Sequence, residues 1–191
     1  MMKELVLDIV SSCNKPTGDF LLDTLFDKYN EASPRDDSPV YYRFLYELGK
    51  RLKDKQPNLI EVGCKYGAAS LHFLKGGGYR SVGIDVADIA NIGMFEGYNF
   101  TFRQDSSTNP DLVSSLAPAD FVFIDTDHTY EQTKREFELW VGKVKPGGLL
   151  LFDDILAKEY GCAKFWQELQ GDKMEFEELH PVGWGFGVYF L

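Results

Sequence analysis

Carboxylate side chains stand where short apolar runs of the sequence end. Asp85, Asp105 and Asp125 each end or follow such a run, and the pair Asp153 and Asp154 ends the last one. These runs are near-continuously apolar, and helical or loop stretches separate them, which is typical of a parallel sheet covered on both faces. Because ligands bind outside the carboxyl ends of such strands, the acids predict a site at one edge of the sheet.

The runs place the elements that must position these acids. We expect parallel strands at residues 59–63, 81–85, 100–104, 120–125 and 149–154, and a helix at about 157–170. Two more strands, in MEFEELH and GFGVYFL, are joined by a connection too short for a parallel crossover. The predicted fold is therefore α/β, a Rossmann-like doubly wound sheet of five parallel strands with a C-terminal antiparallel hairpin at its edge.

The first 45 residues are predicted to form a helical N-terminal segment. Apolar residues recur at helical spacing in 5–26, with breaks at 15–18 and 33–39. From Val40 to Lys55, the apolar side chains of Tyr41, Phe44 and Leu48 trace one face of a further helix. The length of 191 residues suits a single domain, 1–191, in which residues 46–191 form the core.

Charge and cysteine usage restrict the class of protein. Lysines and arginines minus acids give 20 − 30 = −10, a charge that repels nucleic acid and anionic membranes. The three cysteines are too widely spaced for a disulfide framework or a CxxC metal site, which indicates a reducing compartment. Glu4 and Asp8 interrupt any signal peptide, and no apolar run approaches the ~18 residues of a membrane span. We expect a cytoplasmic protein.

Two glycines follow the first expected strand. Gly63 and Gly67 allow a tight turn and a close approach of the backbone to a ligand. Asp85 follows Gly63 by 85 − 63 = 22 residues, where an acid can accept both hydroxyl hydrogens of a ribose. Together they indicate an adenosine-type cofactor, whereas the glycine pair alone would fit a simple turn between strand and helix.

These motifs together resemble a known family. The motifs are ExGxxxG at 61–67, the acid Asp85, Gln104-Asp105-Ser106, and Lys145-Pro146-Gly147-Gly148 before LLLFDD. Over about residues 40–191 the chain is similar to class I S-adenosylmethionine-dependent methyltransferases. IDTDHTYE at 124–131, followed by PGGLLLFDD, resembles more narrowly the small O-methyltransferases related to catechol, macrocin and cephalosporin-hydroxylase-like enzymes. The resemblance implies the seven-stranded methyltransferase fold, with 46–191 as the cofactor-binding core.

The resemblance also implies how S-adenosylmethionine binds. The loop after the first strand, with Glu61, Gly63, Cys64 and Gly67, would hold its methionine part. Asp85 would hold the ribose, and Asp105 with Ser106 would meet the adenine. Ser70 is the candidate for a hydroxyl contact to the carboxylate of the cofactor.

A divalent cation is implied by the same resemblance, through Asp125, Asp153 and Asp154. Three converging carboxylates would repel one another, and a hard cation such as Mg²⁺ or Mn²⁺ relieves that repulsion. The alternative is that Asp153 or Asp154 caps the following helix and that Asp125 only contacts the cofactor.

His128 is the candidate general base. It follows Asp125 by three residues, where catechol-type enzymes carry a basic residue, and the near-neutral pKa of histidine suits proton transfer. Alternatively, His128 frames a helix that begins near Tyr130 with the capping box Thr129-x-x-Gln132. We expect His72 and His180 to lack carboxylate-rich company, and we interpret them as structural.

The predicted activity is metal-assisted methyl transfer from S-adenosylmethionine to a hydroxyl of a small-molecule acceptor. Aromatic residues of the N-terminal segment and final hairpin, Tyr41, Tyr42, Trp184 and Phe186, are expected to flank that acceptor. A nicotinamide-dependent oxidoreductase is disfavoured by the missing third glycine of its fingerprint. A non-catalytic cofactor-binding module leaves the acidic cluster unexplained. We expect neither nucleic acid nor membrane as partner, and a homodimer is compatible with the sequence.

Overall fold

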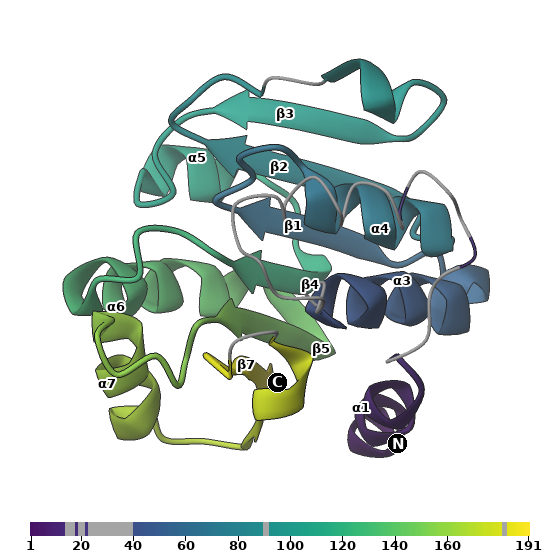
Figure 1. Cartoon of the computed structure of the whole chain (residues 1–191). Coiled ribbons are helices and arrows are strands. Elements are labelled where there is room, and N and C mark those ends of the chain that lie inside the picture. Colours follow the sequence, from purple (N-terminus) through teal and green to yellow (C-terminus); the bar gives the residue numbers. More distant parts are fainter. Residues whose placement is uncertain (14–17, 19–21, 23–39, 90–91, 181–182) are drawn as a thin grey trace, which may run out of the picture.

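The computed structural model describes residues 1–13, 18, 22, 40–89, 92–180 and 183–191. Seven strands form one sheet in the order β3-β2-β1-β4-β5-β7-β6 (Figure 1). The strands are β1 Asn58–Val62, β2 Arg80–Asp85, β3 Phe100–Gln104, β4 Ala119–Ile124, β5 Val144–Asp153, β6 Lys173–Phe176 and β7 Phe186–Phe190. Strands β1 to β5 pair in parallel, and β7 pairs antiparallel to both β5 and β6. The predicted parallel sheet with an edge hairpin is confirmed.

Helices cover both faces of this sheet. The helices are α1 Met2–Ser12, α3 Val40–Leu52, α4 Ala68–Gly76, α5 Pro110–Ser115, α6 Tyr130–Trp140 and α7 Gly161–Glu168. Short 3₁₀ helices are η1 Lys53–Lys55, η2 Ile92–Phe95, η3 Val141–Lys143 and η4 Glu177–Leu179. In Figure 1, α3 and α4 lie in front of the sheet and α5 lies behind it.

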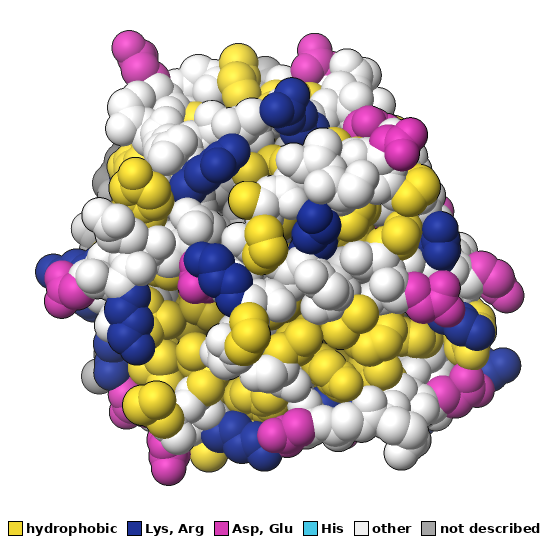
Figure 2. Space-filling view, turned by 180° about the vertical axis from the view of Figure 1, so that it is seen from behind, with side chains coloured by type: hydrophobic (Ala, Val, Ile, Leu, Met, Phe, Trp, Pro, Cys, Tyr) yellow, Lys and Arg dark blue, Asp and Glu magenta, His cyan; other side chains and the backbone are white. Residues whose placement is uncertain are grey.

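Alternation along the strands divides the core into two layers. Phe121 and Phe123 of β4 pack with α1, α3 and α4, whereas Val122 packs on the other face with α5, α6 and α7. Successive side chains of a strand point to opposite faces, so one apolar run supplies both layers. Figure 2, which views the molecule from behind, shows apolar side chains gathered in its lower half among scattered charges.

Some boundaries differ from those expected. Helix α7 begins at Gly161 rather than near 157, because residues 158–159 form a turn and Tyr160 is the N-cap. The predicted division at residue 45 falls inside α3, whose Phe44, Leu45 and Leu48 are buried in the core with α4. The helical prediction around 21–26 lies outside the described residues except for Leu22. None of the described helices has the length and apolar composition needed to cross a membrane.

Candidate active site

The order of strands reverses between β1 and β4, and their carboxyl ends meet there. The Asp125 amide donates to the Val62 carbonyl at 2.9 Å. Gly63 has a φ of +87°, and a Cβ on it would lie 1.7 Å from the carbonyl oxygen of Asp125. Only glycine allows this approach, so the loop after β1 lies directly against the segment that carries Asp125.

Asp85 fixes the same loop from the end of β2. Its carboxylate accepts the amide of Lys65 at 2.7 Å and that of Ala87 at 2.9 Å. Its carbonyl accepts the amide of Asp105 at 2.9 Å, which places the second acid directly alongside. The next residue, Val86, is 71% exposed, so an apolar side chain borders the two acids.

Asp105 is held by its own loop. Its carboxylate accepts the Ser106 amide at 2.7 Å and the side-chain amide of Asn109 at 3.1 Å. The hydroxyls of Ser106 and Thr108 lie 2.9 Å apart. The acids after β2 and β3 are therefore oriented in advance, which favours binding because little order is lost.

Three buried side chains support the loop after β1. They are Glu61 of β1, Cys64 of the loop itself and Ser70 of α4. Glu61 is 3% exposed and accepts hydrogen bonds from the amide and the hydroxyl of Ser70, and that hydroxyl also lies 2.7 Å from the hydroxyl of Ser81. Burial raises the pKa of Glu61 to about 8. Ser70 is fully buried, so its hydroxyl supports the start of α4 rather than facing the open side of the loop. Burial also raises the pKa of the Cys64 thiol, which makes it a poor nucleophile.

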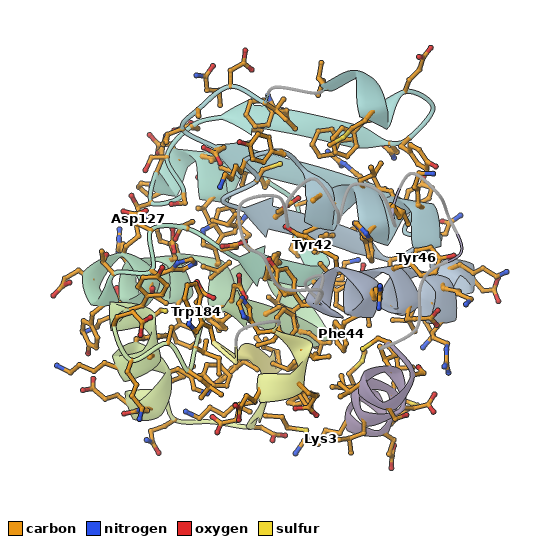
Figure 3. All side chains as sticks on the ribbon, viewed as in Figure 1. Lys3, Tyr42, Phe44, Tyr46, Asp127 and Trp184 are labelled. Atoms are coloured by element: carbon orange, nitrogen blue, oxygen red, sulfur yellow. The ribbon has the colours of Figure 1, made fainter. Side chains whose placement is uncertain are left out.

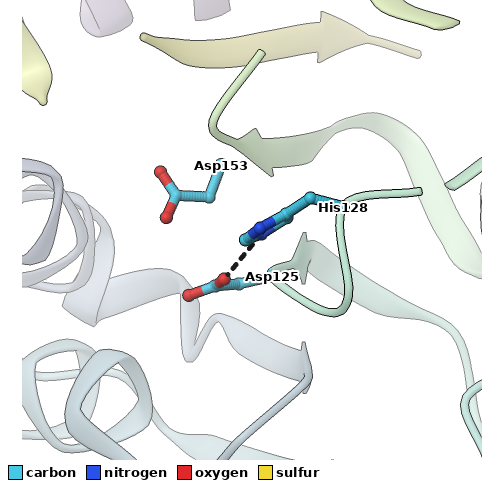
Figure 4. Close-up of side chains that lie close together, drawn as sticks. All are labelled: Asp125, His128 and Asp153. Atoms are coloured by element: carbon cyan, nitrogen blue, oxygen red, sulfur yellow. Dashed lines mark hydrogen bonds and ion pairs between the residues drawn. The ribbon is translucent and has the colours of Figure 1, made fainter. Parts of the chain in front are cut away.

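His128 lies between two carboxylates. Its Nε2 is 3.1 Å from Asp125 Oδ1, in the hydrogen bond drawn in Figure 4, and its Nδ1 is 3.2 Å from Asp154 Oδ2. Burial lowers the pKa of His128, but the bond to Asp125 and the charges of both acids outweigh it, and the net shift is upward. Asp127, which precedes His128 in the sequence, is exposed at the margin of the molecule (Figure 3).

Asp153 is a buried carboxylate of the cluster. Its side chain is 6% exposed, and burial, followed by the charges of Asp125 and Asp154, raises its pKa well above the usual range. The side chain of Tyr41 hydrogen-bonds to it and opposes this shift. Among the described residues, Asp153 Oδ1 and Asp154 Oδ1 have no hydrogen-bond partner although both are buried.

His180 joins the cluster from the end of η4. Its Nε2 lies 3.2 Å from Asp154 Oδ1 and 3.9 Å from Asp153 Oδ1. The premise that His180 lacks carboxylate-rich company is therefore wrong. No local motif could have revealed it, because His180 and Asp154 come together only through the path of the chain after α7.

The capping alternative for the acidic pair does not hold. Helix α7 begins at Gly161 with no side-chain cap, and Asp154 has a left-handed φ of 57° seven residues before it. Helix α6 has Thr129 as its N-cap, which accepts the Gln132 amide at 3.3 Å, so the predicted cap is confirmed. The side chain of His128 takes no part in that cap and turns to the acids.

The described residues form two groups suited to a metal ion. Asp125, His128 and Asp153 are one, Asp153, Asp154 and His180 are the other, and the ligand atoms of each lie within 4.8 Å of one another. The expected set of Asp125, Asp153 and Asp154 does not form such a group by itself. Both groups contain Asp153, so a cation bound in either one would have Asp153 as a ligand together with one histidine.

Aromatic side chains surround this end of the sheet. Tyr41 and Tyr42 come from α3. Trp184 comes from the segment before β7, and Figure 3 labels it together with Tyr42. His180 stacks between Tyr41, with ring centroids 6.0 Å apart, and Trp184, at 5.6 Å. Phe186 also stacks on Tyr41, with ring centroids 5.7 Å apart. All four expected aromatic residues therefore lie beside the acidic cluster or one ring away from it.

Glu136 is a buried glutamate that the sequence did not single out. It is fully buried on α6 and accepts hydrogen bonds from Ser107 at 2.6 Å, Gln132 at 2.8 Å and Thr126 at 2.9 Å. Ser107 follows β3 and Thr126 follows β4, so one carboxylate ties the loop of Asp105 to that of Asp125. Burial raises its pKa despite these donors.

Residues 60–155 match the model of a family described as a methyltransferase domain. The chain belongs to this family. Its fold is that of the class I methyltransferases, and the matched residues contain the glycine loop and every acid of the site. The family assignment leaves no support for the nicotinamide alternative.

Known proteins share the fold at low identity. The chain is similar to an O-methyltransferase from Bacillus cereus solved with S-adenosylhomocysteine, at 16% identity and a TM-score of 0.66 over 100% of both chains. It is also similar to MycE, a methyltransferase of mycinamycin biosynthesis solved with Mg and S-adenosylhomocysteine, at 19% identity and a TM-score of 0.53 over 70% of this chain and 39% of that one. The uncharacterized protein y4gI of Sinorhizobium fredii is 32% identical over 73 residues, 35% of this chain and only 8% of its own length.

Proposed function

We propose that this methyltransferase transfers the methyl group of S-adenosylmethionine to a hydroxyl oxygen of a small molecule, with a divalent cation bound beside the acceptor. The observation that carries the proposal is the cluster of acids and histidines at the ends of β4 and β5. The cluster lies directly against the glycine loop of a methyltransferase-family fold. Its oxygen and nitrogen donors suit the binding and deprotonation of an acceptor hydroxyl.

The cofactor half of the site supports S-adenosylmethionine. Asp85 would accept the ribose hydroxyls, Asp105 would lie at the adenine, and the exposed Val86 offers an apolar surface for the base. Gly63 and Gly67, both at positive φ, form the tight loop whose backbone would face the methionine part. The bound cofactor supplies an activated methyl group on a sulfonium, so the task left to the protein is positioning and the exclusion of water.

The acceptor half fits a divalent cation. Asp153 and Asp154 each have a buried carboxylate oxygen that no described residue supplies with a donor, and such oxygens are costly unless something neutralises them. Asp125, Asp153 and Asp154 are the oxygen ligands we assign to Mg²⁺ or Mn²⁺. When bound, such a cation acidifies an acceptor hydroxyl and helps to orient it. The net charge of −10 favours a small molecule over a nucleic acid as acceptor.

His128 is positioned to take the acceptor proton. Between Asp125 and Asp154 both ring nitrogens face carboxylate oxygens, which favours the protonated imidazolium. Neutralisation of either acid would release the neutral form, which can act as a base. The proton then leaves the hydroxyl for His128 as the oxygen–methyl bond forms and the sulfur–methyl bond breaks.

Calorimetric titration with S-adenosylhomocysteine tests the cofactor site. Replacement of Asp85 by Ala removes two charge-assisted hydrogen bonds of about 1.5 to 3 kcal/mol each, so affinity should fall at least about tenfold. Asp88→Ala is the matched control, because Asp88 carries the same charge in the same loop and is exposed. Equal binding by the two variants would contradict the role of Asp85, and no binding by the parent protein would contradict the proposed function.

A further inference from the structure

The cluster at the ends of β4 and β5 contains histidines as well as carboxylates. Both metal-sized groups of the described residues share Asp153, and each contains one histidine. His128 and His180 flank Asp154, one at each carboxylate oxygen. A cation at this end of the sheet would therefore meet nitrogen as well as oxygen.

The group of Asp153, Asp154 and His180 has the geometry of an incomplete coordination shell. The side chains of Asp153 and Asp154 are each 6% exposed, and within the part of the chain that the structure describes the Oδ1 atom of each has no hydrogen-bond partner. His180 Nε2 faces both atoms. It is 3.2 Å from Asp154 Oδ1, yet the pair is not aligned as a hydrogen bond. The three ligand atoms thus lie within 4.8 Å of one another, and two of them are buried oxygens that find no donor among the described residues.

The ring of His180 is fixed in this orientation. Tyr41 stacks on it with an interplanar angle of 16°, Trp184 with one of 20°, and its amide donates to the Glu177 carbonyl at 3.1 Å. A ligand whose rotamer is fixed by packing loses little freedom when a metal binds. His128, in contrast, places both ring nitrogens against carboxylates and hydrogen-bonds to Asp125.

We propose that His180 Nε2 is a ligand, together with Asp153 and Asp154, of the cation in the proposed active site, and that the site consequently prefers first-row transition-metal ions to Mg²⁺. Imidazole suits Mn²⁺, Co²⁺ and Zn²⁺ progressively better, whereas Mg²⁺ demands oxygen ligands. The inference rests on the proposed function only for the presence of a cation. It concerns which ion binds and through which atom.

Metal binding without turnover tests the inference. We expect the metal-free protein to bind Co²⁺ at least roughly tenfold more tightly than Mg²⁺ in calorimetry. Bound Mn²⁺ should show histidine ¹⁴N modulation in pulsed electron paramagnetic resonance. In His180→Gln the modulation should vanish and the Co²⁺ affinity should fall at least roughly tenfold, while the Mg²⁺ affinity changes little. His128→Asn should keep the modulation.

Three results would overturn the inference. They are the absence of ¹⁴N modulation in the parent protein, its persistence in His180→Gln, and its loss in His128→Asn alone. If His180→Gln does not fold, protein grown with ¹⁵N-histidine replaces the variant, because the ¹⁴N modulation must then disappear without any change of sequence. Titration of the same samples with S-adenosylhomocysteine separates the two proposals, because cofactor binding without the metal result refutes only the role of His180.

Discussion

At the scale of single residues, His128 combines an unusual backbone with two charged partners. Its φ of 57° lies in the left-handed region, where asparagine is common and alanine is strained. Asparagine can therefore adopt the backbone conformation of His128, whereas alanine adopts it only with strain. A comparison of the Asn and Ala variants separates the effect of the backbone conformation from the effect of losing the imidazole.

We expect the loss of the His128 imidazole to lower kcat by roughly 10² to 10⁴, because general-base catalysis acts in the transition state. His128→Asn should keep the melting temperature, whereas His128→Ala should lower it. Both should lose kcat alike and keep their affinity for S-adenosylhomocysteine. Steady-state kinetics and calorimetry measure this, and an Asn variant with nearly full activity would show that the imidazole is not the base.

Glu61 predicts a pH dependence of stability. Its pKa of about 8 in the folded protein exceeds the ordinary value of 4.5, so between these two pH values the folded state retains a proton that the unfolded state has lost. The resulting stabilisation is complete below the lower pKa and is lost as pH rises to the upper one. Over this range the free energy of unfolding should fall by a few kcal/mol, on the order given by the pKa difference.

Glu61→Gln should remove this decline. Urea unfolding at pH 5, 6.5 and 8 gives the measurement, and the exposed Glu96→Gln is the control. If the free energy of unfolding depends on pH in the same way in the parent protein and in Glu61→Gln, then Glu61 is ionised in the folded state.

At the scale of elements, the strands and their terminal acids could be predicted from the sequence. The apolar runs alternate with helical stretches, and the ends of β1, β2 and β4 lie within one residue of those expected. His180 could not be found in this way, because its carboxylate neighbours are 26 and 27 residues away. Glu136 was equally hidden, since a glutamate within an amphipathic helix resembles a surface residue. Both depend on tertiary contacts that leave no local pattern.

The contact between the loop after β1 and the end of β4 gives an element-scale prediction. A methyl group on Gly63 would overlap the Asp125 carbonyl at a backbone angle unfavourable for alanine. Gly63→Ala should therefore lower the free energy of unfolding by far more than the ~1 kcal/mol of an average substitution. Gly142→Ala, which has nothing within 4 Å, should stay within about 1 kcal/mol of the parent in urea unfolding. Similar values for the two variants would contradict this packing.

At the scale of the whole molecule, ligand binding should appear as stability. S-adenosylhomocysteine at 100 times its Kd should add about 2.7 kcal/mol. For a chain of this size, that raises the melting temperature by about 5 to 11 °C. A thermal melt with NAD in place of S-adenosylhomocysteine should show no shift. An equal shift with both ligands would point to a non-selective nucleotide site.

The position of β7 between β5 and β6 affects how the protein can be synthesised. A ribosome makes β5 more than thirty residues before β7, so the β5 edge that ends in Asp153 has no partner during that interval. The register of β5 with β7 pairs Asp153 with Phe186 at the very start of β7. The nascent chain therefore carries an incomplete active site until the last strand of the fold has emerged, and chaperone protection of that open edge would matter most during this interval.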